Sequence, residues 1–561
     1  MKPLNNKSLN NLTPYLLASL LFLAYIGLIN DLNAKTRITL GRKTVYQELE
    51  IFIPFLKEAI LVLILISSIL ELKKNPTIYL IILVISITSY ITKLRLALPI
   101  IGILVTLTWL TIKDKTPLKT KITELSYALS LIIIGVCIGA SIKYSTFFIF
   151  PSKFLSDSSW TIAEIHLKLI HSLQPVMMIT YTLLPLIPLI RWTLKKSKFR
   201  KIIKKIEIEE TFSKKASYLI LLSSIILASI QNVLPYLPTV NPKMDPVGVD
   251  VYYYNKWMKK VLNYGPIGVF EVANGSRPLY MLILYTAYET SKLPLRQIIE
   301  FMPTFLLPPL VLSTFYMTLK VTKSHSCAAL ASLFTATGIQ TTVGIYASFQ
   351  ANLLALSITY FSIGLMYSKI RRKILLPTLF FLFLIAELIH PSTAHILVFL
   401  ILQTVLGQRT KRKEKIQHLL FSASGLLTAD ITKSIMAKEV GGTAPAVGGR
   451  WAYKFITNLV NNLNNYWRTS YDVISLYYGG FMTWPLLTLL LLMCVLYMEN
   501  ITEFMEPWLL TMAPIYVSGW GPYTRLAFNI PFQIPLAYLT LWVSRHDKLY
   551  SIALIIISLS Y

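Results

Sequence analysis

The stretch Tyr218–Pro238 reads YLILLSSIILASIQNVLPYLP and contains no charged residue. A helix needs about 20 predominantly apolar residues to cross the hydrocarbon core of a bilayer, so this stretch predicts a transmembrane helix. Apolar stretches of similar length recur at Pro14–Asn30, Ile51–Leu72, Leu167–Trp192, Ile298–Leu319 and Gly480–Met498. None of them alternates apolar and polar residues as the strands of a membrane barrel do. We therefore expect an all-α polytopic membrane protein.

The composition and charge of the chain agree with this fold class. Charged residues make up 14% of the chain, against about 25% in soluble proteins, and the mean hydropathy is +0.58. The net charge of +28 comes largely from basic residues in short loops between apolar stretches, at Lys113–Lys121, Lys195–Lys205, Lys369–Lys373 and Arg409–Lys415. Such loops are typically cytoplasmic and attract anionic membrane lipids. We therefore expect no nucleic-acid partner and a multi-pass protein of the cell membrane with a cytoplasmic N-terminus.

Placing the basic loops inside gives about 17 transmembrane helices. This arrangement requires that one apolar stretch, Pro278–Lys292, does not cross, because Lys369–Lys373 would otherwise lie outside. The stretch is short and carries three tyrosines and Glu289. We therefore expect it to form a juxtamembrane helix along the outer interface, as amphipathic aromatic-rich helices do.

Two long loops should lie on the outer face, at residues 239–277 and 438–479. They divide the chain into an N-terminal multi-span region, residues 1–210, and a second region, residues 211–561, that carries both loops. Loops of this length are usually functional. We therefore searched these loops first for candidate site residues.

The first outer loop contains two carboxylates near the membrane surface, Asp245 and Asp250. Asp250 could accept a proton from a substrate or bind a divalent cation. It could equally cap the N-terminus of the amphipathic helix expected at Tyr252–Leu262, which is a common role for Asp. Tyr253 lies in this helix, and Glu271 follows it.

Two arginines are candidates for binding an anion on the same face. Arg450 follows a pair of glycines in the second outer loop, where backbone and guanidinium could approach a phosphate, although a flexible surface loop would look the same. Arg525 lies at the outer end of a late span, where it could bind a diphosphate or a phosphate, or reach an ordinary lipid headgroup.

Histidines and cysteines give weaker signals. His390 and His395 share the expected outer turn of the hairpin at 374–406, where an imidazole could bind substrate or transfer a proton. A third metal ligand is absent nearby in the sequence. The three cysteines lie in apolar stretches, which indicates neither disulfides nor a thiolate metal site.

Three motifs together resemble the GT-C class of membrane glycosyltransferases over residues 215–561. They are DPVGVDVYYY at Asp245–Tyr254, RPLY at Arg277–Tyr280 and RLAFNIP at Arg525–Pro531. In that class a span leads into a long outer loop with an acidic motif, juxtamembrane helices follow, and an Arg often lies near the outer end of a late span.

The resemblance implies that a sugar is transferred from a polyprenyl-phosphate-linked donor to an acceptor protein, lipid or glycan on the outer face. Asp250 would be the catalytic base or a metal ligand, supported by Asp245. The donor phosphate would be bound by Arg525 and Arg450, and the substrate by His390, Tyr253 and Glu271. Whether a divalent cation, Mg²⁺ or Mn²⁺, is required stays open.

The sequence also departs from the class. It has no WWDYG-like motif, and six expected spans precede the acidic motif without a counterpart in the simplest members. A transporter or flippase for a lipid-linked sugar or similar amphiphile is the main alternative, although the chain shows no internal repeat. A non-catalytic assembly subunit is a third.

Overall fold

The computed structural model describes residues 38–40, 43–45, 184–196, 210–238, 241–242, 245–391, 393–406, 412–440, 499–513, 528–545, 552 and 555. The chain divides into two compact units, Met1–Tyr144 with Phe154–Pro175, and Ser145–Lys153 with Val176–Tyr561. In the first unit the described residues form one antiparallel pair of strands, β1 (Ile38–Leu40) and β2 (Lys43–Val45). This hairpin is an exception to the expected all-helical fold.

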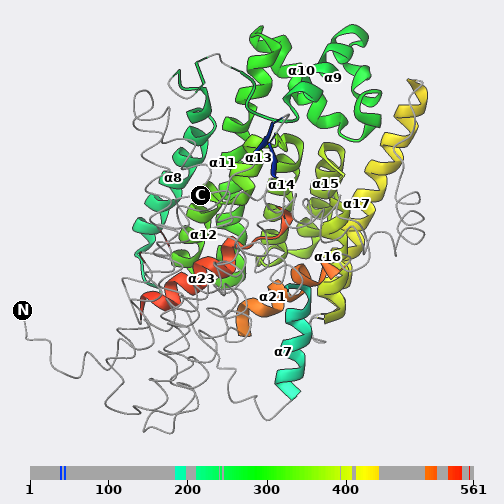
Figure 1. Ribbon diagram of the computed structural model, residues 1–561. Coiled ribbons are helices and arrows are strands. Elements are labelled where there is room, and N and C mark those ends of the chain that lie inside the picture. The colour runs from blue at the N-terminus through cyan, green and yellow to red at the C-terminus, as the bar shows by residue number, and fades with distance from the viewer. Residues whose placement is uncertain are drawn as a thin grey trace, which may run out of the picture. The chain divides into compact units, whose positions relative to one another are not determined.

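In the second unit, all the described elements are helical (Figure 1). They are η2 (Leu184–Leu186), α7 (Ile187–Lys196), α8 (Lys214–Gln231), η4 (Leu234–Tyr236), α9 (Val251–Tyr264), η5 (Pro266–Phe270), η6 (Val272–Gly275), α10 (Pro278–Ser291), α11 (Leu295–Thr322), α12 (His325–Thr337), α13 (Ile339–Tyr346), α14 (Gln350–Met366), α15 (Arg372–Ile389), α16 (Thr393–Leu406), α17 (Arg412–Glu439), α21 (Glu499–Leu510) and α23 (Gln533–Ser544). Within the described residues, Lys214–Tyr236 and Leu295–Thr322 are long and apolar enough to cross a membrane, judged by length and composition.

Helix α8 has the surface of a membrane helix rather than that of a soluble one. The Ser213 hydroxyl caps its first turn by accepting a hydrogen bond from the Ala216 amide. Its buried face, packed against α11 and α12, consists mainly of small residues, and its exposed face carries large apolar side chains such as Leu219, Leu222 and Ile226. Small residues inside and large apolar residues outside are typical of helices that pack together in lipid.

Helix α11 contains prolines whose effects are compensated by neighbouring helices. Pro303 and Pro308 have no N–H group, so the carbonyls of Ile299 and Thr304, four residues earlier, lose their helical donors. The Gln350 side-chain amide of α14 donates to the Ile299 carbonyl at 2.7 Å, and the Ser229 hydroxyl of α8 donates to the Thr304 carbonyl at 3.4 Å. Side chains satisfy broken helices in this way where water is absent.

Helix α10 does not run the length of the helical body. The Tyr280 hydroxyl in its first turn donates to the Gln350 side-chain oxygen at 2.6 Å, while the same Gln350 side chain donates to Ile299 near the start of α11. One side chain therefore contacts the start of α10 and the start of α11, so these two starts lie at the same end. In Figure 1, α10 lies beside α9, as their mutual contacts require.

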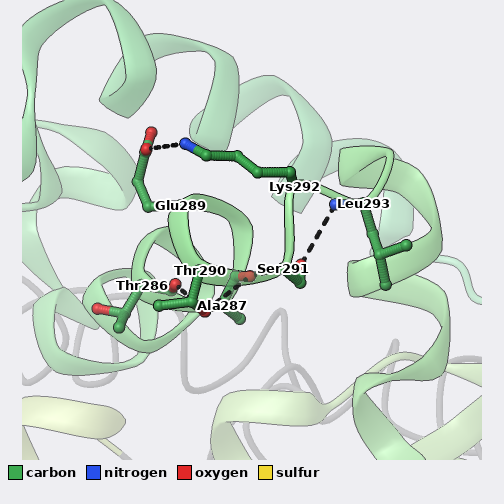
Figure 2. Close-up of polar contacts among 7 residues, drawn as sticks. All are labelled: Thr286, Ala287, Glu289, Thr290, Ser291, Lys292 and Leu293. Atoms are coloured by element: carbon green, nitrogen blue, oxygen red, sulfur yellow. Dashed lines mark hydrogen bonds and ion pairs between the residues drawn. The ribbon is translucent and has the colours of Figure 1, made fainter.

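The end of α10 is defined by local hydrogen bonds (Figure 2). Lys292 adopts the left-handed conformation (φ 54°) and its amide donates to the Tyr288 carbonyl, a common C-terminal arrangement. The Ser291 hydroxyl accepts from the Leu293 amide at 3.3 Å, and the Lys292 ammonium pairs with Glu289 at 2.6 Å. α11 then begins three residues after Lys292.

Helices α15 and α17 form a parallel pair. Near its middle, a Cβ on Gly425 of α17 would lie 2.3 Å from the Phe380 carbonyl oxygen of α15, so only glycine permits this close backbone approach. Arg372 and Glu414 contact each other at 3.9 Å, which places the N-terminal ends of both helices together. The two basic stretches at the starts of these helices therefore share one end of the pair.

Polar side chains stabilise the two late helices that the structure describes. Arg191 of α7 pairs with Glu506 of α21 at 2.6 Å, so an acidic residue lies within this largely buried helix. Helix α23 begins at Gln533, after an irregular stretch at residues 530–532. Beside this stretch, Gln340 donates to the carbonyls of Phe528 and Ile530, each at 3.0 Å.

Candidate functional site

The acidic loop begins with a closed turn at Asp245. The Asn241 side-chain amide donates to the Asp245 carbonyl at 2.7 Å, and its oxygen accepts from the Asp245 amide at 2.9 Å. The Asp245 side chain is exposed. Asn241 therefore orders the start of the loop and leaves the carboxylate of Asp245 toward solvent.

Asp250 occupies the N-cap position of α9, which is where a role in capping this helix would place it. Its φ and ψ of −82° and −1° are helical, and its side chain makes no capping hydrogen bond to the first turn. A capping Asp normally adopts an extended backbone and accepts from the second or third amide of the helix. The half-buried carboxylate is therefore not used for capping, although its position is that of a cap.

The loop between Asp245 and Asp250 packs against the junction of α13 and α14. A Cβ on Gly248 would lie 1.6 Å from the Ser348 hydroxyl oxygen and 3.0 Å from the Ser348 Cβ, so a larger residue at this position requires the serine side chain to move. Ser348 is itself buried and has a positive φ of 54°. This contact places Asp250, two residues after Gly248, beside the helical body.

The inner face of α9 forms a cluster of aromatic rings around Tyr254. Tyr254 is fully buried, and its ring makes edge contacts with Trp257 and Tyr280, each with a centroid distance of 5.4 Å. The Arg277 guanidinium donates to the Tyr254 hydroxyl at 3.0 Å and lies over the Trp257 ring, 5.0 Å from its centroid. Tyr280 continues the network to Gln350, so the cluster joins α9, α10, α11 and α14.

The expected anion-binding arginines, Arg450 and Arg525, lie outside the described residues. Three residues after Arg525 in the sequence, the Phe528 ring contacts the Phe349 ring with a centroid distance of 5.6 Å. Phe349 directly follows Ser348, against which Gly248 is packed. The acidic loop and the segment beginning at Phe528 therefore meet at the same helix junction.

Of the expected substrate-binding residues, Tyr253 is exposed on α9, and Glu271 contacts Lys260 at 3.7 Å. His390 ends α15 with a buried side chain, and His395 is buried in α16, where its Nε2 lies 2.6 Å from the Thr511 hydroxyl. Both imidazoles are therefore buried, next to the turn between α15 and α16.

Sequence reasoning did not single out two charged groups. Lys433 of α17 is buried between Glu387 of α15 and Asp430, at 2.5 and 2.7 Å. Arg277 appeared only as part of a motif, yet it lies at the centre of the aromatic cluster. The spacing of Asp430 and Lys433 by three residues was the available signal for the first group.

Among the residues that the structure describes, no three His, Cys, Asp or Glu side chains are arranged to hold a metal ion. No family model matches the chain, and no curated protein or solved structure matches it either. The chemistry of the site therefore has to be argued from its own residues.

Proposed function

We propose that this protein is a membrane glycosyltransferase that moves a sugar from a polyprenyl-phosphate-linked donor to an acceptor on the outer face of the membrane. The observation that carries the proposal is the position of Asp250. Its carboxylate lies at the start of α9 without capping it, and Gly248 holds the loop against the α13–α14 junction.

In this reaction Asp250 accepts a proton from the acceptor hydroxyl or amine. The deprotonated oxygen or nitrogen attacks the anomeric carbon, the bond from that carbon to the phosphate oxygen breaks, and the polyprenyl phosphate leaves with the electron pair. Positive groups that bind the phosphate stabilise this developing charge. Arg525 is proposed for that role because its motif ends in the segment anchored at the same junction as the acidic loop.

The membrane arrangement supports a site at one surface. The start of α10, the start of α11 and the loop at Gly248 are joined through Gln350 and the neighbouring Ser348. Gly275, just before α10, lies beside Ala437 near the C-terminal end of α17, opposite the end with the basic stretches. We propose that this end is the outer one, following the positive-inside rule.

The full-length protein in liposomes, supplied with polyprenyl phosphates carrying radiolabelled hexoses or pentoses and with a membrane extract as the source of acceptor, tests the proposal. Transfer of labelled sugar from the lipid to an acceptor is expected with at least one donor, and Asp250→Asn should reduce it at least 100-fold, as for loss of a general base (about 10²–10⁴-fold). The control variant is Glu289→Gln, which alters an exposed carboxylate of α10 and should keep full activity. Unchanged activity in Asp250→Asn would assign the chemistry to another residue.

A further inference from the structure

Arg277 is held in place by aromatic groups rather than by a carboxylate. Its guanidinium donates to the Tyr254 hydroxyl and lies 5.0 and 5.7 Å from the ring centroids of Trp257 and Tyr254. Such contacts fix the plane of the guanidinium and attract its charge through the ring faces. Among the described residues, none of these contacts supplies a counter-ion for the charge.

Three other arginines in the described residues differ in this respect. Arg191, Arg296 and Arg372 contact Glu506, Glu300 and Glu414 respectively. No described carboxylate contacts Arg277. Glu271, the acidic residue nearest to it in the loop, contacts Lys260 instead.

Part of the Arg277 guanidinium also lacks a hydrogen-bond partner. Its Nε–H group is buried and makes no hydrogen bond in the described residues. Arginine remains charged at any physiological pH, so the group cannot reduce this penalty by losing its proton. An anion bound beside the fork of the guanidinium would supply both a counter-charge and acceptor oxygens.

The backbone around Arg277 favours an anion as well. Arg277 is the N-cap residue of α10, a helix of 14 residues, so the positive end of the helix dipole adds to the positive side chain.

We infer that Arg277 binds the phosphate group of a lipid, with the Trp257 and Tyr254 rings holding its guanidinium in position. A phosphate fits because its several oxygens can accept two parallel N–H bonds from the guanidinium. A lipid fits because Tyr252 and Tyr253, exposed on the same helix α9, are the residue type found at membrane surfaces.

The site lies close to the proposed base. The Tyr254 amide donates to the Asp250 carbonyl at 3.0 Å, so Asp250 precedes the ring under Arg277 by one helical turn, a rise of about 5.4 Å. A phosphate on Arg277 would therefore place its sugar near the Asp250 carboxylate. This identification of the lipid as the sugar donor rests on the proposed function, whereas phosphate binding itself does not.

Binding to the full-length protein in detergent tests the inference with four probes: decaprenyl phosphate, uncharged decaprenol, phosphatidylglycerol and inorganic phosphate. Decaprenyl phosphate should bind more tightly than decaprenol, and Arg277→Ala should weaken it about 10- to 100-fold, the range for a lost charge-assisted hydrogen bond. Arg277→Lys keeps the charge without the planar fork and should fall between. Lys256→Ala, an exposed basic residue of α9, is the matched control and should bind as the unaltered protein does.

Each outcome has a defined meaning. Preference for decaprenyl phosphate over phosphatidylglycerol identifies a site for polyprenyl phosphates. Equal Arg277-dependent binding of phosphatidylglycerol identifies an ordinary lipid headgroup, and both outcomes support a lipid-phosphate site. Arg277-dependent binding of inorganic phosphate as tight as that of decaprenyl phosphate would overturn the lipid assignment. If Arg277→Ala and Arg277→Lys both bind decaprenyl phosphate with unchanged affinity, the inference is wrong. Intact binding without sugar transfer from any donor would instead contradict only the proposed function.

Discussion

Gly248 of the acidic loop and Ser348 of the α13–α14 junction approach so closely that a Cβ on Gly248 would lie 1.6 Å from the serine hydroxyl oxygen. This contact holds the loop immediately before Asp250 against the helical body. It predicts that Gly248→Ala displaces the loop and lowers sugar transfer at least tenfold. Because the clash is with the hydroxyl, Gly248→Ala combined with Ser348→Gly should recover most of the activity.

The control for that experiment is the thermal stability of each variant in detergent. Gly248 lies at the surface of the body, so Gly248→Ala should unfold within a few degrees of the unaltered protein. If Gly248→Ala transfers sugar at the normal rate, the contact does not position the catalytic carboxylate.

Replacing Lys433 should destabilise the pairing of α15 and α17. Lys433→Met leaves the buried Glu387 carboxylate without its partner, and removing one member of a buried ion pair typically costs about 3–5 kcal/mol. Lys433→Met combined with Glu387→Leu removes the two buried charges, leaves only the more exposed Asp430, and should restore much of that loss. Unfolding in a denaturing detergent, followed by circular dichroism, measures the difference.

The double variant decides between two interpretations. If it is as unstable as Lys433→Met alone, the destabilisation comes from lost packing around the long lysine side chain and not from an uncompensated charge. Recovery in the double variant would show that Lys433 mainly neutralises Glu387.

Gln350 should contribute to stability through the proline of α11. Gln350→Leu leaves the Ile299 carbonyl and the Tyr280 hydroxyl without partners, and each buried unsatisfied group costs about 1–3 kcal/mol. Pro303→Ala restores a backbone N–H to the Ile299 carbonyl. The penalty of Gln350→Leu should therefore be smaller in the Pro303→Ala background, which a double-mutant cycle of unfolding free energies measures.

Equal penalties in the two backgrounds would mean that the Gln350 side chain and the proline act independently. Tyr280→Phe provides the complementary control. It removes only the other hydrogen bond of Gln350, so the effect of Pro303→Ala should be the same with or without it.

Glu210 contacts the start of α12 and should make the stability of the folded protein depend on pH. Although its partial burial would raise the pKa of this carboxyl, hydrogen bonds from the amides of Ser326 and His325 and from the Ser326 hydroxyl lower it below the ordinary value of 4.5. Because the folded pKa is depressed, the stabilisation is complete above pH 4.5 and is lost as the pH falls through the folded pKa. Glu210→Gln should therefore lower the melting temperature at pH 7 by a few degrees and have a smaller effect at about pH 3.

A control variant tests whether the pH dependence of the melting temperature comes from Glu210 itself. Glu289→Gln, which alters an exposed carboxylate at the end of α10, should lower the melting temperature little at either pH. A constant difference between Glu210→Gln and the unaltered protein from pH 7 to pH 3 would contradict the assignment.

The sequence predicted local features well because hydrophobic period and helix signals are local. The amphipathic helix expected at Tyr252–Leu262 is α9, and the short stretch Pro278–Lys292 is α10. It did not predict the partners of charged groups. Lys433 meets Glu387 across 46 residues of chain, and Arg191 meets Glu506 across 315, and nothing local marks either pair.

The sequence predicted the acidic loop of the candidate site, but it did not predict the contacts that hold this loop in place. Asp250 was identified at its correct position before α9, but the glycine contact with Ser348 depends on how distant helices pack. The burial of His390 and His395 was also invisible, because the sequence places them at a turn and only the packing of α16 against α21 covers His395. The importance of Arg277 was not predictable either, because it depends on the packing of Tyr254 and Trp257 around its guanidinium.

The prolines of α11 have a consequence for the order in which the protein is made. Ser229, which donates to the Thr304 carbonyl, is synthesised before α11. Gln350, which donates to the Ile299 carbonyl, is synthesised after α11. When α11 leaves the ribosome, the Thr304 carbonyl can be satisfied at once, whereas the Ile299 carbonyl must wait for α14. In ribosome-bound chains that stop before residue 350, α11 should therefore be less stably packed than in chains that extend past α14.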